Sequence, residues 1–366
     1  MVSTLSSMKR TSGSTSGFQT SSSPPGFRNL ISNGDMSIAQ RGTSFVSPSS
    51  QDYTLDRWSW HHTGGCAVTI TQDTDVPTGE GFINSLKIDC TTADTQDAGD
   101  LGYLRYVVED KDFDRCYFGT ANAKAVTLSF WMKSDNKTGT MCLSCQNMGA
   151  YNDSYVAEIT VSDNNWNKYT VSLTGPSSGT WTHLLMTFGL TIGSTYQGAS
   201  AGTWLGLGSK LATSNQTNFL DNTANNILIT GVQLEVGSSA TDFEHVPWDY
   251  QLSRCQRYYW KTFAYATAPG NNVGFLGSLR GRGICVDADE PWVDVRFPVA
   301  MRTTPTVTSY NWGTGTAGEW ASSGDVADSG ARPTNFNDNG GQIDNTDAAA
   351  AANDTWNIHA AADAEL

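Results

Sequence analysis

The sequence has few charged residues, and this scarcity narrows the class of protein. Only 16% of its 366 residues are Asp, Glu, Lys or Arg, against about 25% in an average soluble domain. Gly is abundant at 36 residues, and Ser, Thr and Asn are frequent, so hydroxyl and amide groups supply much of the polarity. Such a composition favours a turn-rich, all-β protein with many short strands over a helical one.

Basic residues are the scarcer of the two charged classes. The chain has 22 Lys and Arg against 36 Asp and Glu, a net charge of −14. A field of this sign repels a phosphate backbone, so we expect no nucleic acid among the partners. Many of the acids gather towards the C-terminal end, where solubility is the first interpretation and a few Ca²⁺ sites the second. No loop spacing supports a metal site, and we predict neither a metal nor a cofactor.

Long apolar runs are also absent. No stretch approaches the roughly 20 apolar residues of a membrane-spanning helix, and the first residues lack the apolar core of a signal peptide. The cysteines are odd in number and scattered, unlike a disulfide framework: Cys66, Cys90, Cys116, Cys142, Cys145, Cys255 and Cys285. We therefore expect a chain made in a reducing cytosol, without membrane insertion, whose surface suits an extracellular role. A virus-particle component fits both properties.

Three regions follow one another along the chain. Residues 1–28 are rich in Ser, Thr and Gly and cannot bury enough apolar surface to fold alone, so we predict an extended arm, with a disordered tail as the alternative. Residues 29–248 contain about nine or ten runs of alternating polarity separated by Gly, Asn, Ser and Asp, which predicts an antiparallel jelly-roll β-sandwich. Within it, residues 193–210 are expected to form a long loop or loosely paired strands.

Residues 249–366 break this rhythm. Leu252, Cys255 and Tyr259 share one face of a helix, so a short helix within residues 249–260 is predicted. Tyr258–Trp260 is expected to start a strand, and a small β-rich domain follows. Residues 311–366 have a low density of apolar residues. We expect this segment to gain its burial from neighbouring copies of itself.

Motifs with metal or redox chemistry have bland explanations here. Cys142 and Cys145 form a CxxC pair, but no second pair follows, and residues three apart on a strand face opposite sides. His61 and His62 are neighbours on a strand and cannot bind one metal without a bend. We interpret the cysteines as small buried hydrophobes and the histidines as surface or strand-end residues.

Catalytic motifs are likewise missing. The sequence shows no nucleophile elbow, zinc-protease helix, P-loop or dinucleotide fingerprint. Two adjacent carboxylate pairs, Glu109–Asp110 and Asp289–Glu290, leave glycosidic hydrolysis open without establishing the spacing that it requires. We predict that the chain is not an enzyme.

Aromatic residues are the positive signal, with 12 Trp in the chain. Trp and Tyr offer flat apolar faces on which a pyranose ring can stack, while amides and carboxylates satisfy its hydroxyls. Three tryptophans in the C-terminal loops are the predicted glycan contacts: Trp312, Trp320 and Trp356. Packing within a domain or at a trimer interface is the alternative for each.

A set of ordered motifs carries a family resemblance. It begins with the segments Asn29–Met36, Gln40–Arg41 and Thr54–Trp58, and continues with Ile229–Gly237, Ala240–His245, Cys255–Tyr259, Phe297–Arg302, Thr304–Val307 and Ala362–Leu366. In this order the motifs resemble a family of bacteriophage tail-fibre and virion proteins, over residues 29–366. Asp242 stands where that family usually has proline.

The resemblance implies a carbohydrate-binding-module-like jelly roll, a small β-rich C-terminal domain and a homotrimeric fibre. It further implies a place in the phage tail, after assembly in the host cytoplasm, and binding to host surface polysaccharide or lipopolysaccharide. We expect residues 1–28 to dock on tail, baseplate or adaptor proteins, with Pro24, Pro25 and Phe27 as anchoring residues. A purely structural collar, adaptor or decoration protein and a polysaccharide-degrading tailspike remain alternatives.

The motif residues also have structural interpretations. Asp56 and Arg57 are predicted to form an ion pair beside Trp58, with the guanidinium stacked on the indole. Glu235 and Glu244 are predicted to pair with an arginine: Arg41, Arg57 or Arg254. These residues are expected to specify the fold and not the sugar.

Overall fold

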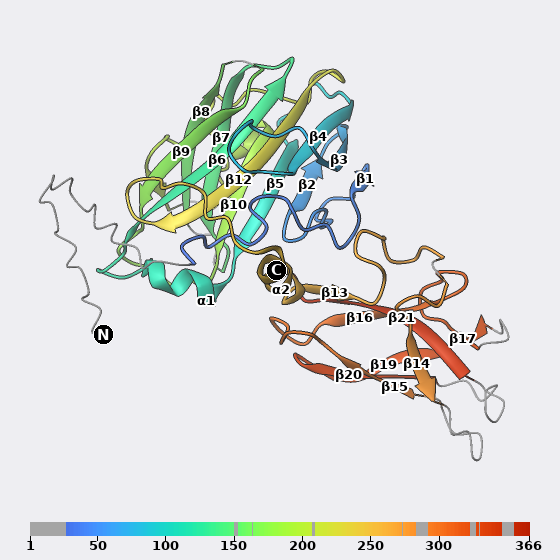
Figure 1. Ribbon diagram of the computed structural model, residues 1–366. Helices are drawn as coiled ribbons and strands as arrows, with labels where there is room; N and C mark the ends of the chain where they lie inside the picture. The colour runs from blue at the N-terminus through green and yellow to red at the C-terminus, as the bar shows by residue number, and fades with distance from the viewer. Residues whose placement is uncertain are drawn as a thin grey trace, which may run out of the picture.

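The computed structural model describes residues 27–149, 153–162, 164–206, 209–272, 274–282, 292–322, 327–328, 330–345 and 355–366. Regular structure in these residues is nearly all antiparallel β-sheet, as the composition predicts (Figure 1). Helical segments are few and short: α1 (Asp110–Phe113), η1 (Asp114–Cys116), η2 (Ser194–Tyr196) and α2 (Trp248–Gln256). The strands form a large sandwich and a smaller C-terminal β domain.

Two six-stranded sheets make a jelly-roll β-sandwich, which confirms the predicted fold class. The first sheet has the order β1 (Ser44–Val46), β3 (Ala67–Asp73), β4 (Ser85–Thr92), β12 (Asn226–Val236), β6 (Ala125–Asp135) and β9 (Asn167–Thr174). The second sheet has the order β11 (Trp204–Leu205), β8 (Ser154–Val161), β7 (Gly139–Asn147), β10 (Leu184–Ile192), β5 (Leu101–Val108) and β2 (Ser59–Thr63).

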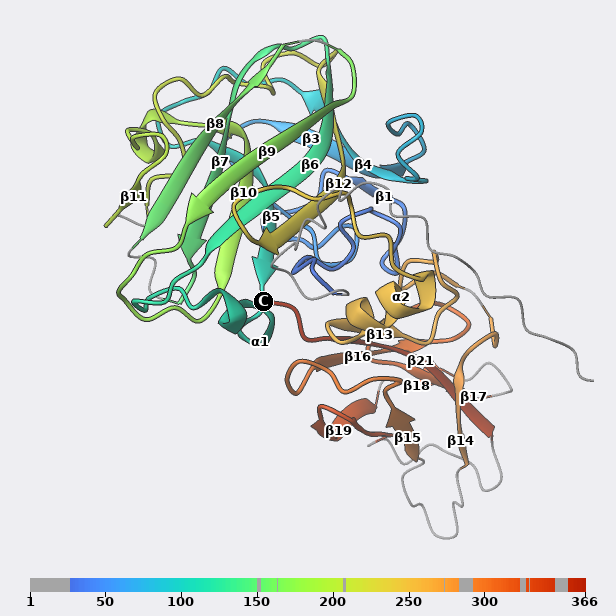
Figure 2. The same cartoon turned by 60° about the vertical axis from the view of Figure 1, so that its left-hand side comes forward.

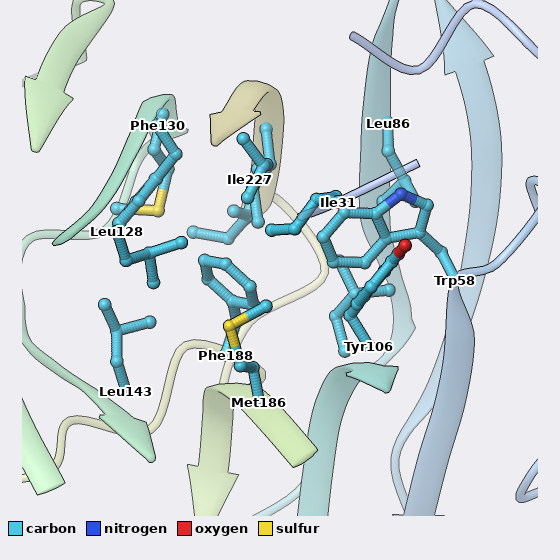
Figure 3. Packing of buried hydrophobic residues seen from close by; sticks show 14 of the residues in the cluster. Ile31, Trp58, Leu86, Tyr106, Leu128, Phe130, Leu143, Met186, Phe188 and Ile227 are labelled. Carbon is cyan, nitrogen blue, oxygen red and sulfur yellow. The ribbon is translucent and has the colours of Figure 1, made fainter. Parts of the chain in front are cut away.

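The core of the sandwich lies between the inner faces of these sheets (Figure 3). Along β5, Leu104, Tyr106 and Val108 point inward, and the intervening residues point to the other face. At the centre, Phe188 packs its ring edge-on to Phe130, with the ring centroids 5.2 Å apart. The period-two alternation of the sequence thus places one row of apolar side chains per strand in the core.

A bulge in β12 brings together two of the sequence motifs, Asn29–Met36 and Ile229–Gly237. Gly231 has a φ of 62°, and the pairing of β12 with β6 shifts register between Thr230 and Gln233. Beyond the bulge the strand no longer pairs with β4. It bonds instead to the segment before β1, where the Val232 N–H donates to the Gly34 carbonyl (2.8 Å). A Cβ on Gly34 would lie 2.0 Å from the Val232 carbonyl oxygen, so this approach requires glycine.

The C-terminal domain begins after α2, the helix expected over 249–260. One sheet has the path β13 (Tyr259–Lys261), β21 (Thr355–Asp363), β17 (Trp320–Ser322) and β18 (Ala327–Asp328), and β14 (Leu279–Arg282) and β16 (Thr306–Asn311) also pair with β21. The other has the order β15 (Trp292–Arg296), β20 (Gly340–Asn345) and β19 (Ala331–Asn337).

This domain has a hydrophobic core of its own, which corrects one expectation. Trp320, Ile343, Trp356 and Ile358 are at most 1% exposed and pack together in it. The low apolar density of residues 311–366 suggested burial against other copies of the chain. A few large side chains, brought together from distant strands, bury much of the described part of this segment within one chain.

The cysteine pair is buried as predicted, whereas the prediction of a surface or strand-end position was wrong for His61, which is 9% exposed in the middle of β2. Cys145 lies in the sandwich core, while Cys142 lies on the opposite face of β7 with a second apolar cluster. The cysteines in the described part of the chain are all unpaired and buried. Within the described ranges, no group of three or more His, Cys, Asp and Glu could hold a metal ion, and no helix is long and apolar enough to cross a membrane.

Candidate functional site

Two of the three predicted glycan-binding tryptophans are core residues. Trp320 is 0% and Trp356 is 1% exposed, so neither indole has a face open to a sugar, and this prediction was wrong for both. Trp312 is partly exposed, but Phe275 already covers one face of its indole, with the centroids 3.6 Å apart. Its ring N–H donates to the Ala321 carbonyl (3.2 Å).

The predicted ion pair between Asp56 and Arg57 does not form. The carboxylate of Asp56 instead accepts two hydrogen bonds from Gln40, one from its backbone N–H and one from its side chain, each 2.6 Å long. The Arg57 guanidinium stacks on the ring of Tyr258 at 3.5 Å rather than on Trp58. Arg57 has a φ of 73°, and this left-handed turn separates its side chain from those of its neighbours.

Arg57 takes part in a buried lock between the sandwich and the C-terminal domain. Its guanidinium forms an ion pair with Glu365 and donates to the Val107 carbonyl on β5 (2.6 Å). Arg41 pairs with Asp363 (2.9 Å) and contacts Glu365 (3.4 Å). Figures 1 and 2 both show the C-terminus between the two domains, where these residues meet.

The central ion pair of this arrangement, between Arg57 and Glu365, is almost entirely out of water. The side chains of Arg57 and Glu365 are 1% and 3% exposed. Burial raises the pKa of the Glu365 carboxyl, and the positive charges of Arg57 and Arg41 oppose that rise. Motifs near the start, middle and end of the sequence therefore meet here and fix the domains to each other. We name Arg41, Arg57, Asp363 and Glu365 the junction lock.

The other two motif carboxylates bind backbone and neutral groups, so the predicted arginine pairs were wrong. Glu235 accepts from the backbone N–H (2.8 Å) and the hydroxyl of Thr241. Glu244 accepts from the Asn29 backbone N–H (2.9 Å) and thereby ties the segment after β12 to the start of the sandwich. Arg254 pairs with Asp112 (3.4 Å). The contacts of both glutamates support a structural role.

The arm residues are described only in part. Pro24 and Pro25 lie outside the described residues. Phe27 is 59% exposed, and its ring lies against Tyr250 of α2 with the centroids 4.9 Å apart. The Arg115 side chain donates to the Phe27 carbonyl (2.9 Å). The described chain thus starts beside η1 and α2.

A cleft on the outer face of the second sheet was not predicted from the sequence. Residues 193–206 and 209–216 fold over one part of that face, where Ala199, Leu211 and Ala212 pack on Cys142 and Val156. Beside this cover a cleft of about 320 Å³ remains. We name it the sheet-face cleft, and its described lining is Gln51, His61, Leu101, Tyr103, Arg105, Gln146, Leu185, Tyr196, Ser209 and Leu211.

Three side chains from β2 and β5 form the polar centre of this cleft. The rings of His61 and Tyr103 stack nearly parallel, with an interplanar angle of 8° and centroids 5.2 Å apart. An Arg105 Nη lies 3.2 Å from the Nε2 atom of His61. Burial, with the positive charge of Arg105 second, lowers the pKa of His61 to about 4. The imidazole is therefore neutral near pH 7, and its Nε2 accepts the hydrogen bond from Arg105.

The lining of the cleft suits a polar ring with many hydroxyl groups. Tyr103 and Tyr196 supply aromatic rings that are only partly buried. Gln146 and Ser209 add an amide and a hydroxyl, which can each donate and accept. The sequence did contain one signal for this cleft. Tyr103 and Arg105 are two residues apart on a predicted strand, so their side chains must lie on the same face.

A larger hollow of about 510 Å³ lies at the junction of the domains. Its charged lining includes Arg41 and Asp363, which already pair with each other. Tyr53, also in its wall, donates its hydroxyl to the Leu366 carbonyl (2.5 Å). Because these polar groups are occupied in the junction lock and beside it, we regard the smaller sheet-face cleft as the better candidate site.

Glu109 and Asp110, the described carboxylates considered for hydrolysis, do not line that cleft. Glu109 accepts hydrogen bonds from Arg257 (3.1 Å) and from the Tyr258 hydroxyl (2.5 Å). Asp289 and Glu290 lie outside the described residues. Among the described residues that line the sheet-face cleft there is no Asp or Glu.

Comparison with known proteins gives structural similarities alone. No family model matches the sequence. No curated protein matches it either. Tailspike protein 4 of bacteriophage CBA120, in its enzymatically active domain, is similar with 19% identity and a TM-score of 0.33; the match covers 57% of this chain and 21% of the tailspike chain.

Carbohydrate-binding modules are also among the similar structures. A CBM4 module has 16% identity and a TM-score of 0.31, with 57% of this chain and 99% of the module covered. A family 11 module from Clostridium thermocellum, solved with a β-1,3-1,4-mixed-linked tetrasaccharide, has 10% identity and a TM-score of 0.28, with 55% and 99% covered. The fold assignment given above stands on the strand order of this chain.

Proposed function

We propose that the protein is a phage tail fibre that binds a host-surface glycan through the sheet-face cleft. The observation that carries this proposal is the cluster of His61, Tyr103 and Arg105 in a cleft on the outer face of the second sheet. A partly exposed tyrosine ring beside polar side chains is the chemistry that recognises a sugar ring. The ordered motifs over residues 29–366 support the assignment to a virion.

The proposed role is binding without catalysis. Hydrolysis of a glycosidic bond needs two carboxyl groups about 5–10 Å apart across the bond, and the described lining of the cleft offers none. A single open cleft with one or two stacking rings gives modest affinity. We therefore propose a homotrimer, in which three sites per fibre and several fibres per particle raise the avidity without tight single sites.

Attachment to the particle is the second part of the proposal. Residues 1–28 would bind a tail, baseplate or adaptor protein, starting from the point where Phe27 packs on Tyr250. A chain without residues 1–28 should still bind host cells yet fail to enter particles assembled in infected hosts. Normal incorporation of the truncated chain would refute this part and leave the glycan site untouched.

The test of the glycan site is a binding measurement with one tyrosine variant and one control. Labelled full-length protein is added to host cells before and after periodate treatment, and Tyr103→Ala is compared with Tyr117→Ala. Tyr117 is also a tyrosine of the sandwich, 48% exposed and away from the cleft.

We expect periodate to abolish binding and Tyr103→Ala to weaken it at least about tenfold, equivalent to about 1.4 kcal/mol. Tyr117→Ala should bind like the unmodified protein. If Tyr103→Ala binds normally while periodate still abolishes binding, the glycan site lies elsewhere on the protein. If periodate has no effect, the glycan is not the receptor.

A further inference from the structure

Arg105 is a buried cation without an acidic partner among the described residues. It is 9% exposed, and its described polar contacts are a His61 ring nitrogen (3.2 Å) and the Met148 sulfur (3.4 Å). Its Nε atom is buried and has no hydrogen-bond partner. The buried arginines of the junction lock, Arg41 and Arg57, each pair with a carboxylate.

Such an arrangement is unfavourable in the free protein. A buried charge costs several kcal/mol unless an opposite charge or several hydrogen bonds compensate for it. The neutral imidazole of His61 supplies one acceptor and no charge, and a thioether sulfur is a weak acceptor. The guanidinium therefore has N–H groups that are not hydrogen-bonded to the described residues, and no described carboxylate neutralises its positive charge.

The position of Arg105 makes this charge accessible to a molecule in the cleft. The residue lines the sheet-face cleft together with Tyr103, which precedes it by two positions on β5. Among the described residues of that lining no side chain carries a negative charge, although the chain as a whole has a net charge of −14. The cleft is thus a local positive site on an acidic protein.

We infer that the sheet-face cleft selects an acidic saccharide, in which the carboxylate of a hexuronic acid residue pairs with the guanidinium of Arg105. This inference rests on the proposed function and gives it a ligand class. The sugar ring lies against Tyr103, and the hydroxyl of Ser209 faces the ring hydroxyls. A carboxylate on an arginine forms charge-assisted hydrogen bonds, which are about twice as strong as neutral ones.

The experiment compares uronic acid polysaccharides with their own carboxyl-reduced forms. The probes are polygalacturonate, alginate, hyaluronan and the acidic polysaccharide of the host, each before and after chemical reduction of the carboxyl groups to primary alcohols. Reduction leaves the linkages in place and removes the charge. Binding of the full-length protein is measured at low and at physiological salt.

We expect at least one unreduced polymer to bind ten times more tightly, or better, than its reduced form. Arg105→Gln should abolish this preference, and Arg105→Lys should keep part of it, since lysine retains the charge but not the planar fork. Arg296→Gln is the matched control, because it removes one positive charge from an exposed position on β15 in the other domain. The preference should survive in that variant.

The outcomes separate this inference from the proposed function. Equal binding of reduced and unreduced polymers, with loss of both in Tyr103→Ala, overturns the acidic class and retains a glycan site. A preference that is unchanged in Arg105→Gln overturns the role of Arg105. Binding to no glycan of any kind overturns the proposed function as well. The comparison of polymers needs no variant, so it decides the question even if Arg105→Gln fails to fold.

Discussion

Replacing Glu365 with Gln removes the negative charge at the centre of the junction lock. The Glu365 carboxylate pairs with Arg57 and lies 3.4 Å from an Nη of Arg41. After the substitution Arg41 keeps its ion pair with Asp363, whereas Arg57 keeps the Val107 carbonyl and the rings of Tyr258 and Tyr106, none of which carries a charge. The variant therefore leaves one buried guanidinium without a counter-charge.

The cost of this change follows from burial. Breaking a buried ion pair by removing one partner destabilises a protein by about 3–5 kcal/mol, whereas an exposed pair contributes about 0–1 kcal/mol. Arg57 and Glu365 belong to the first class, with side chains 1% and 3% exposed. For 366 residues unfolding together, an entropy of about 2.1 cal/mol/K per residue converts this loss into a fall of about 4–6 °C in Tm.

The assay is calorimetry with urea unfolding of the full-length protein, and Glu80→Gln is the control. Glu80 is an exposed acid on the sandwich, so its substitution should change the free energy of unfolding by less than about 0.5 kcal/mol. Combining Glu365→Gln with Arg57→Met should recover part of the loss, with a coupling energy of about 1–3 kcal/mol.

The result that refutes this reasoning is a loss below about 1 kcal/mol for Glu365→Gln, which is the range of a solvated pair. Additive effects of Glu365→Gln and Arg57→Met would also refute it, because they would show that the two side chains do not interact. A transition that splits in two, with the C-terminal domain unfolding first, is compatible with the lock and would show that it couples the domains.

Two further predictions concern the second core and the cleft. Trp356→Ala should lower the free energy of unfolding by about 3–5 kcal/mol, as for other buried aromatic residues. Calorimetry should show the C-terminal domain melting at a lower temperature while the transition of the sandwich stays in place. A loss below about 1 kcal/mol would contradict the burial of this indole. The pKa of His61 is lowered to about 4 in the folded protein from its ordinary value of 6.5. As the pH falls, the unfolded chain therefore takes up a proton on His61 before the folded chain does. The stability that neutral His61 contributes above pH 6.5 is lost as the pH falls from 6.5 towards 4. His61→Gln should lose less stability than the unmodified protein over that range, and parallel profiles of unfolding free energy against pH would rule this out.

Much of the sandwich could be read from the sequence because strand alternation is local. A row of apolar residues at every second position, as at Leu104, Tyr106 and Val108, identifies the buried face of a strand without knowledge of its partner. The same rule places Cys142 and Cys145 on opposite faces of their strand, and likewise His61 and His62. The glycines of the motifs are local signals too, although the reason for Gly34, its approach to Val232, appears only in the folded chain.

Site residues were harder to predict because their roles depend on partners far away in the sequence. Trp320 and Trp356 stand among polar and small residues, as binding residues often do, and only the meeting of strands from residues 293 to 364 buries them. Asp56 and Arg57 are neighbours of opposite charge, yet the turn at Arg57 turns them to different partners.

The sequence by itself determined the class of fold, the order of its motifs and the faces of its strands, because these depend on composition and on spacings of two to seven residues. Tertiary structure decided which charges meet. Arg57 finds Glu365 across 308 positions, and Arg105 finds no carboxylate among the described residues. Whether a charge is paired or stays open to a ligand depends on groups far away in the sequence, which no local pattern identifies. For that reason the sheet-face cleft became visible only in the folded chain.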